Sequence, residues 1–171
     1  MHPPDGIARA LEFRGELARI RIMMSSDSVP SKSNTCEFVV GRLMEIRVAA
    51  GYHTVRDVEE MMAMMREQIS RLPEEQKFVI AADWRNVTVM PPDTAARARD
   101  MLAHSNPRVI RSSILVRPGQ ATTSLQVVRL VKEADNDNRR HFEAAHRQIS
   151  WLSEVLSEPE VQRLREFLRV G

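Results

Sequence analysis

An uninterrupted apolar run, Phe78 to Ala82, limits the possible folds more than any other part of this sequence. The run, FVIAA, stops at Asp83 and contains no alternation of apolar and polar side chains. A strand exposed on one face alternates, whereas a strand covered on both faces reads as a continuous apolar segment. The run therefore predicts a central strand in a sheet that carries helices on both faces.

The flanking segments supply the other elements of an α/β fold. Residues 36–51, CEFVVGRLMEIRVAAG, alternate apolar and polar side chains on both sides of Gly41-Arg42, which predicts a β-hairpin. Segments with helical spacing then alternate with short strands. This order predicts a mixed, mostly parallel sheet of four to five strands, with an N-terminal hairpin and four to five helices.

Several helix starts can be predicted from their capping residues. Thr54 precedes Asp57 by three residues and Ser157 precedes Glu160 by three, as in a capping box. Asp93 is a candidate N-cap for a helix that reaches about His104. For the helix that begins at Thr122 or Thr123, the predicted core side consists of Leu125, Val128, Leu130 and Val131.

Composition places these elements in one folded domain. Residues 25–35, SSDSVPSKSNT, are Ser-rich, so residues 1–35 are predicted to be a tail and flexible linker and residues 36–171 the domain. The 25 basic and 23 acidic residues interleave, which does not fit a nucleic-acid binder. No apolar stretch approaches the roughly 18 residues of a membrane span. The N-terminal residues lack the features of a signal peptide, so we expect a cytoplasmic protein.

The sequence contains no recognisable catalytic or metal-binding set. Cys36 is the only cysteine, and the five histidines form no HExxH motif. The six glycines form neither GxGxxG nor GxxxxGK[ST], and no GxSxG is present. We therefore expect a protein that is not an enzyme and that has neither cofactor nor metal.

The segment after the central strand is the first candidate binding site. Ligands and partners of open α/β sheets meet the carboxyl ends of the strands. Asp83 stands at such an end, where its carboxylate can either fix the following loop or meet a ligand. The candidate loop residues are Asp83, Trp84, Arg85, Asn86 and Thr88.

A cluster of methionines, MMAMM at 61–65, is the second candidate. Four methionines in five residues cover more than one face of a helix. They predict either an adaptable core helix or an apolar surface of Met61, Met64 and Met65 for a partner. A third interpretation is an apolar pocket beside this helix, which a closed apolar cavity of a few hundred Å³ there would favour.

The order of elements, the strand ending in Asp83-Trp84-Arg85 and the late segment HFEAAHRQISWL resemble the STAS-like superfamily. Within it, residues 36–168 resemble the bacterial branch akin to the sporulation anti-sigma-factor antagonist. The resemblance implies a non-enzymatic module that binds proteins or small molecules. The antagonists carry a phosphorylatable Ser after the Asp and a nearby Gly, both missing here. Thr88 is the hydroxyl left for phosphorylation in this loop.

These observations lead to two functional expectations. The first is a regulatory or scaffolding STAS-like domain that binds a protein partner or a second copy of itself through the loop from Asp83 to Thr88. The second is a carrier of a small molecule or lipid, with an apolar pocket beside the Met-rich helix. A related carrier family, CRAL-TRIO, binds apolar ligands on the same general plan.

Overall fold

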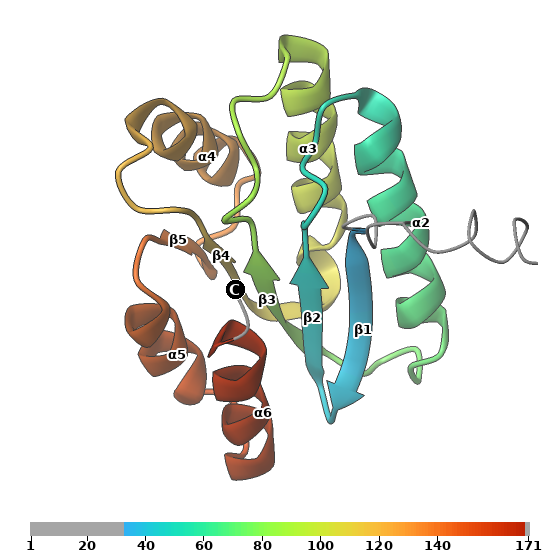
Figure 1. Ribbon diagram of the computed structural model, residues 1–171. Coiled ribbons are helices and arrows are strands. Elements are labelled where there is room, and N and C mark those ends of the chain that lie inside the picture. The colour runs from blue at the N-terminus through green and yellow to red at the C-terminus, as the bar shows by residue number, and fades with distance from the viewer. Residues whose placement is uncertain (1–32, 170–171) are drawn as a thin grey trace, which may run out of the picture. The chain divides into compact units, whose positions relative to one another are not determined.

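The computed structural model describes residues 33–169, apart from the side chain of Asn106 (Figure 1). The tail and linker predicted for residues 1–35 lie outside the described residues, except for the last three. Thr35 already belongs to the first strand. The first strand thus begins one residue before the start of the domain predicted for residues 36–171.

The centre of the domain is a five-stranded sheet in the order β1-β2-β3-β4-β5. β1 and β2 pair antiparallel, and every other neighbouring pair is parallel. This arrangement confirms the predicted α/β fold with a mixed, mostly parallel sheet and an N-terminal hairpin. The strands are β1 (Thr35–Val40), β2 (Leu43–Arg47), β3 (Phe78–Asp83), β4 (Val109–Leu115) and β5 (Arg139–Phe142).

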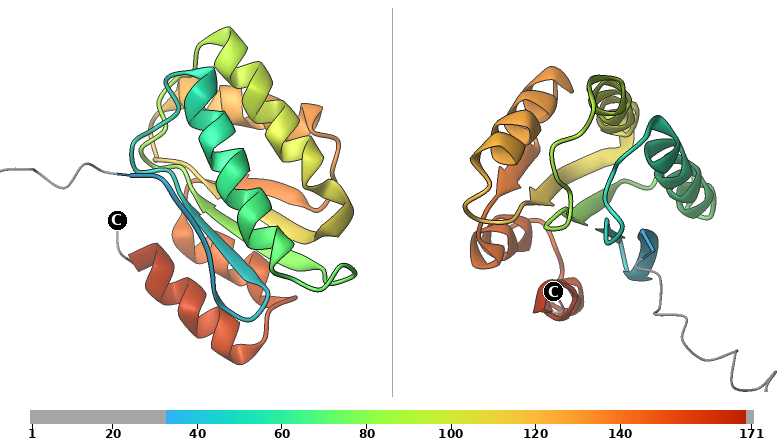
Figure 2. Two further views of the ribbon diagram at one scale, coloured as in Figure 1. Left: turned by 90° about the vertical axis from the view of Figure 1, so that its right-hand side faces the viewer. Right: turned by 45° about the horizontal axis from the view of Figure 1, so that its top comes forward.

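Within residues 33–169, five helices cover the sheet on both faces. α2, α3 and α4 lie on one face, and α5 and α6 lie on the other (Figures 1 and 2). A short 3₁₀ helix, η1 (Asn106–Arg108), connects α3 to β4. The helices are α2 (Val55–Ser70), α3 (Pro92–His104), α4 (Ala121–Glu133), α5 (Ala145–Ser153) and α6 (Glu158–Arg169).

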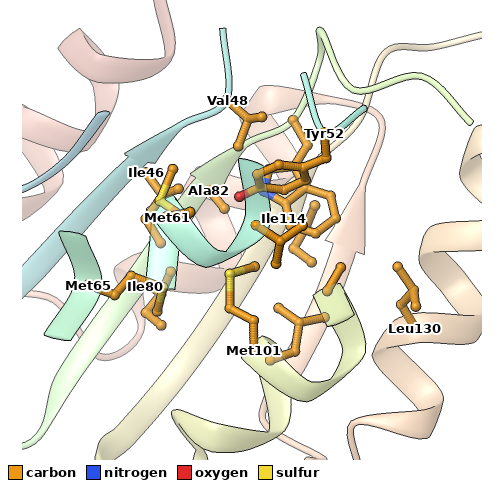
Figure 3. Packing of buried hydrophobic residues seen from close by; sticks show 14 of the residues in the cluster. Ile46, Val48, Tyr52, Met61, Met65, Ile80, Ala82, Met101, Ile114 and Leu130 are labelled. Atoms are coloured by element: carbon orange, nitrogen blue, oxygen red, sulfur yellow. The ribbon is translucent and has the colours of Figure 1, made fainter. Parts of the chain in front are cut away.

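β3 is the strand whose apolar run the sequence makes conspicuous, and all six of its residues are buried. Successive side chains of a strand point to opposite faces. Ile80 and Ala82 accordingly join the core beneath α2, α3 and α4 (Figure 3). Val79 and Ala81 join the second core beneath α5 and α6. Burial on both faces explains why the run has no polar member.

The hairpin and the start of α2 form as their sequences predict. Gly41 in the hairpin turn has φ +56°, a left-handed conformation that glycine adopts without strain. At the start of α2, the Asp57 N–H donates to the Thr54 hydroxyl at 3.4 Å. The Thr54 N–H donates to Asp57 Oδ2 at 2.7 Å, which completes the capping box.

One prediction for the later helices is wrong, and another holds only in part. Asp93 is not the N-cap of α3, because Pro91 holds that position and Asp93 lies in the first turn. On α4, Leu130 is buried and Val131 packs against the core as predicted, but Leu125 and Val128 are 70% and 40% exposed. Thr123 and Val127 are buried in their place. The apolar residues of α4 are compatible with more than one buried face of the helix. Which face is buried depends on how the helix packs on the sheet.

Candidate functional site

Asp83 at the carboxyl end of β3 is bound by two arginines rather than free for a ligand. Arg47 Nη1 donates to Asp83 Oδ2 at 2.6 Å, and Arg85 Nη2 donates to the same oxygen at 2.8 Å. Asp83 Oδ1 accepts from Arg85 Nε at 2.9 Å and from the Arg85 N–H at 3.2 Å. Both carboxylate oxygens are therefore occupied by contacts within the domain.

The same two arginines cap the C-terminal end of α6. Arg47 Nη2 donates to the Phe167 carbonyl at 2.5 Å, and Arg85 Nη2 to the Leu168 carbonyl at 3.4 Å. The last carbonyls of a helix have no partner within the helix and carry partial negative charge, so cations there are stabilising. Asp83 thus joins β2, β3 and α6 through its arginines. Of the two roles expected for this carboxylate, it takes the structural one and not the binding of a ligand.

The charges around Asp83 keep it ionised. Burial by itself raises the pKa of this carboxyl group. The hydrogen bonds from Arg85 and the positive charges of Arg85 and Arg47 outweigh burial and hold the pKa of Asp83 below its ordinary value. The guanidinium of Arg85 in turn has its pKa raised by its hydrogen bond to Asp83.

Trp84 lies in the core and is not a docking residue. Its side chain is 1% exposed, and its ring meets that of Tyr52 edge to face with centroids 5.2 Å apart. The backbone N–H of Trp84 donates to the Leu115 carbonyl at 2.8 Å, which continues the pairing of β3 with β4 beyond the strand end. The part of the prediction that placed Trp84 on a contact surface is therefore wrong.

Asn86 and Thr88 are the exposed members of the predicted loop. Asn86 Oδ1 accepts from Arg117 Nη2 at 3.0 Å, and Asn86 Nδ2 donates to the Ala49 carbonyl at 3.4 Å. These contacts hold the loop against the segments that follow β2 and β4. Thr88 is accessible to a modifying enzyme, so its phosphorylation stays a prediction.

The methionines of α2 do not form the predicted apolar surface. Met61 is completely buried and faces the sheet (Figure 3), so its assignment to a surface is wrong. Met64 is half-buried and packs against the core. Met65 is 7% exposed. The helix turns these side chains inward because α2 packs on both the sheet and α3.

A pocket of about 470 Å³ opens beside the Met-rich helix. It lies between the C-terminal parts of α2 and α3, at the amino end of β3 and thus at the opposite edge of the sheet from Asp83. Several residues at its rim are exposed, so the pocket is open to solvent and is not the closed cavity expected for a carrier. Its lining is mainly apolar and consists of Met62, Met65, Arg66, Ile69, Ser70, Leu72, Glu74, Phe78, Met101, His104, Ser105, Pro107 and Arg108.

Behind one wall of this pocket lies a buried arginine. Ser105, a lining residue, accepts a hydrogen bond at its Oγ from Arg139 Nη2 at 3.1 Å. Arg139 is 3% exposed, and its Nε and Nη1 have no hydrogen-bond partner among the described residues. Burial lowers the pKa of Arg139 to about 10, so the side chain stays charged at neutral pH.

The part of the chain that the structure describes offers little for catalysis. No three His, Cys, Asp or Glu side chains within residues 33–169 are grouped so that they could hold a metal ion. Burial, with a smaller contribution from the charge of Glu37, raises the pKa of the Cys36 thiol to about 12. A thiol of that pKa is almost entirely protonated at neutral pH and is a poor nucleophile.

No helix among the described residues has the length and apolar character needed to cross a membrane.

The comparisons with known proteins found no matching family model, no matching curated protein and no matching solved structure. The resemblance to the STAS-like superfamily therefore stays a prediction.

The methionine cluster suggested an apolar pocket beside α2, but it did not indicate which residues form the second wall. Met62 and Met65 line it, but the opposite wall comes from Met101, His104 and Pro107. Those residues are some 40 positions away in the chain, and their approach to α2 is set by packing. The sequence signal for the pocket was the apolar residues near the C-terminal ends of α2 and α3. Such residues are equally typical of a filled core.

Proposed function

We propose that this chain is a non-catalytic binding domain whose pocket between α2 and α3 holds a small apolar ligand. The pocket carries this proposal, because its volume of about 470 Å³ falls in the range of roughly 300–1,000 Å³ that is usual for small-molecule sites. Its apolar side chains and few polar groups also fit such a site. A core that closed completely over Met62, Met65 and Met101 would have left no such space.

The composition of the walls supports an apolar occupant of variable shape. Met62, Met65 and Met101 are long and unbranched, so they can adjust to ligands that differ in outline. Phe78 closes the pocket at the amino end of β3. Displacement of water from such a surface contributes about 25 cal/mol per Å² of apolar area, the main favourable term for a ligand of this kind.

A fluorescence titration with the neutral apolar dye N-phenyl-1-naphthylamine tests this proposal. Ser70→Trp adds bulk at the rim of the pocket, and Ala63→Trp adds the same side chain at an exposed position of α2 outside it. We expect saturable dye binding that Ser70→Trp weakens about tenfold, or ~1.4 kcal/mol, and that Ala63→Trp leaves unchanged. Equal effects of the two substitutions, or no saturable binding, would overturn the proposal.

A protein partner at the carboxyl edge of the sheet is the second candidate. Val89 and Leu125 are 51% and 70% exposed. Their chain neighbours Met90 and Gln126 are joined by two hydrogen bonds of 2.9 Å, so the two exposed side chains extend from one contact. In this reading the domain is regulatory, as the STAS-like resemblance implies. Sedimentation of the wild type and of Leu125→Ser tests the case of self-association, which requires a dimer that the substitution dissociates.

A further inference from the structure

The charged side chains that line the pocket are mainly cationic. Arg66 is exposed on α2, and Arg108 belongs to η1. Neither forms an ion pair with any carboxylate among residues 33–169, and Glu74 is the one acidic side chain in the lining. With two arginines against the single Glu74, the lining has a net positive charge and attracts anions.

Arg108 is held in a fixed orientation with one nitrogen left over. Its Nε and Nη2 donate to the Gln76 carbonyl at 3.1 and 2.8 Å, and Nη2 also donates to the Pro73 carbonyl at 2.7 Å. Its Cζ lies 6.0 Å from the centre of the Phe78 ring. Within the described part of the chain, Nη1 has no hydrogen-bond partner. A guanidinium that is already oriented loses little freedom when it binds an anion.

The buried Arg139 adds a third positive charge on the same side of the domain. It lies one hydrogen bond behind the pocket wall, through Ser105. Buried charges in proteins are usually paired, because an unpaired one loses its hydration without compensation. An anion in the pocket would be attracted by Arg139 as well as by the two lining arginines.

We infer that the ligand of this pocket is an amphipathic carboxylate, an alkyl chain with an anionic head; this inference rests on the proposed function. The alkyl chain lies against Met62, Met65 and Met101. The head accepts hydrogen bonds from Arg108 Nη1 and from Arg66 at the rim. A neutral lipid would leave both arginines without a partner, and a cationic amphiphile would be repelled by them.

Calorimetric titrations with three amphiphiles of equal chain length test the inference at neutral pH and monomeric concentrations. The amphiphiles are decanoate, 1-decanol and decyltrimethylammonium. We expect decanoate to bind at least about tenfold more tightly than 1-decanol, as one charge-assisted hydrogen bond would produce. We expect the cation to bind most weakly. Equal affinity for decanoate and 1-decanol, or preference for the cation, would overturn the inference and leave the pocket's function standing.

Matched variants locate the head group. Arg108→Gln and Arg66→Gln should each lower the affinity for decanoate several-fold without changing that for 1-decanol. Arg56→Gln on the same helix removes a charge that is paired with Glu60 outside the pocket, and it should change neither affinity. Because Arg108 also holds the loop before β3, Arg66→Gln alone decides the matter if Arg108→Gln does not fold. Loss of decanoate binding in Arg56→Gln would contradict the inference, and absence of binding by all three amphiphiles would refute the proposed function itself.

Discussion

The backbone N–H of Arg42 donates a hydrogen bond of 2.6 Å to Glu160 Oε1, and this contact ties the hairpin turn to the first turn of α6. Glu160 Oε2 accepts from the Ser157 N–H at 2.7 Å, which is one of the two hydrogen bonds of the predicted capping box. One carboxylate thus stabilises a helix start and a turn that lie 118 positions apart in the chain.

Glu160→Gln is expected to lower the free energy of unfolding by about 1–3 kcal/mol, because charge-assisted hydrogen bonds from buried groups are lost or weakened. Urea denaturation measures the effect. Glu158→Gln removes the same charge from an exposed position of the same helix turn and should change stability by no more than about 0.5 kcal/mol. Similar values for the two variants would show that Glu160 has no special role.

The close approach of Gly41 to Glu160 gives a second prediction. A Cβ at Gly41 would overlap Glu160 Oε1, and the backbone there has φ +56°. Gly119 has a similar φ of +77° but no heavy atom near the position of a Cβ. Gly119→Ala should therefore lose only the conformational term of about 1–2 kcal/mol. Gly41→Ala should lose more in the same thermal or urea unfolding experiment, and a smaller loss at Gly41 would contradict the described contact.

Removal of the Asp83 charge should destabilise the protein without affecting the pocket. Asp83→Asn leaves Arg47 and Arg85 largely buried without a counter-charge, which should lower the free energy of unfolding by about 2–4 kcal/mol. Asp100→Asn, which breaks an exposed pair with Arg99, should cost less than about 1 kcal/mol. Dye affinity at the α2–α3 pocket should not change in either folded variant. A loss of dye binding in folded Asp83→Asn would instead place the binding site at the carboxyl edge of the sheet.

Acidification should lower the free energy of unfolding, because it removes the same charges of Asp83 and Glu160. The pKa values of Asp83 and Glu160 are both lowered in the folded protein, from ordinary values of 3.8 and 4.5. Their contribution is therefore complete above the unfolded pKa values and is lost as the pH falls below about 4.5 through the lowered folded values. Unfolding free energies measured across that range should fall more steeply for the wild type than for Asp83→Asn with Glu160→Gln. Parallel curves would argue against the lowered pKa values.

Much of the fold could be predicted because its patterns are local or are imposed by burial. The unbroken run of β3 is a direct consequence of cover on both faces, and the capping box of α2 is complete within four residues. The exposed face of α4 could not be predicted, because its apolar residues, among them Leu125 and Val127, allow two stripes and tertiary packing chooses between them.

The site was harder to predict than the fold. Asp83, Trp84 and Arg85 attract attention in the sequence because they follow a central strand, yet their contacts come from Arg47, Tyr52 and α6, which no local pattern connects to them. The pocket has two walls that are distant in the chain. Its position at the amino edge of the sheet is opposite to the edge where open α/β sheets usually bind ligands.

The methyl groups of the methionines provide the most direct measurement of the central claim, that the pocket between α2 and α3 binds a ligand. In methyl-labelled protein titrated with decanoate, the NMR signals of Met62, Met65 and Met101 are predicted to shift together and to saturate. The signals of Met44 in β2 and of Met90 at the opposite edge of the sheet are predicted to stay in place. Unchanged signals for the three pocket methionines, or saturating shifts centred on Met90, would contradict the account.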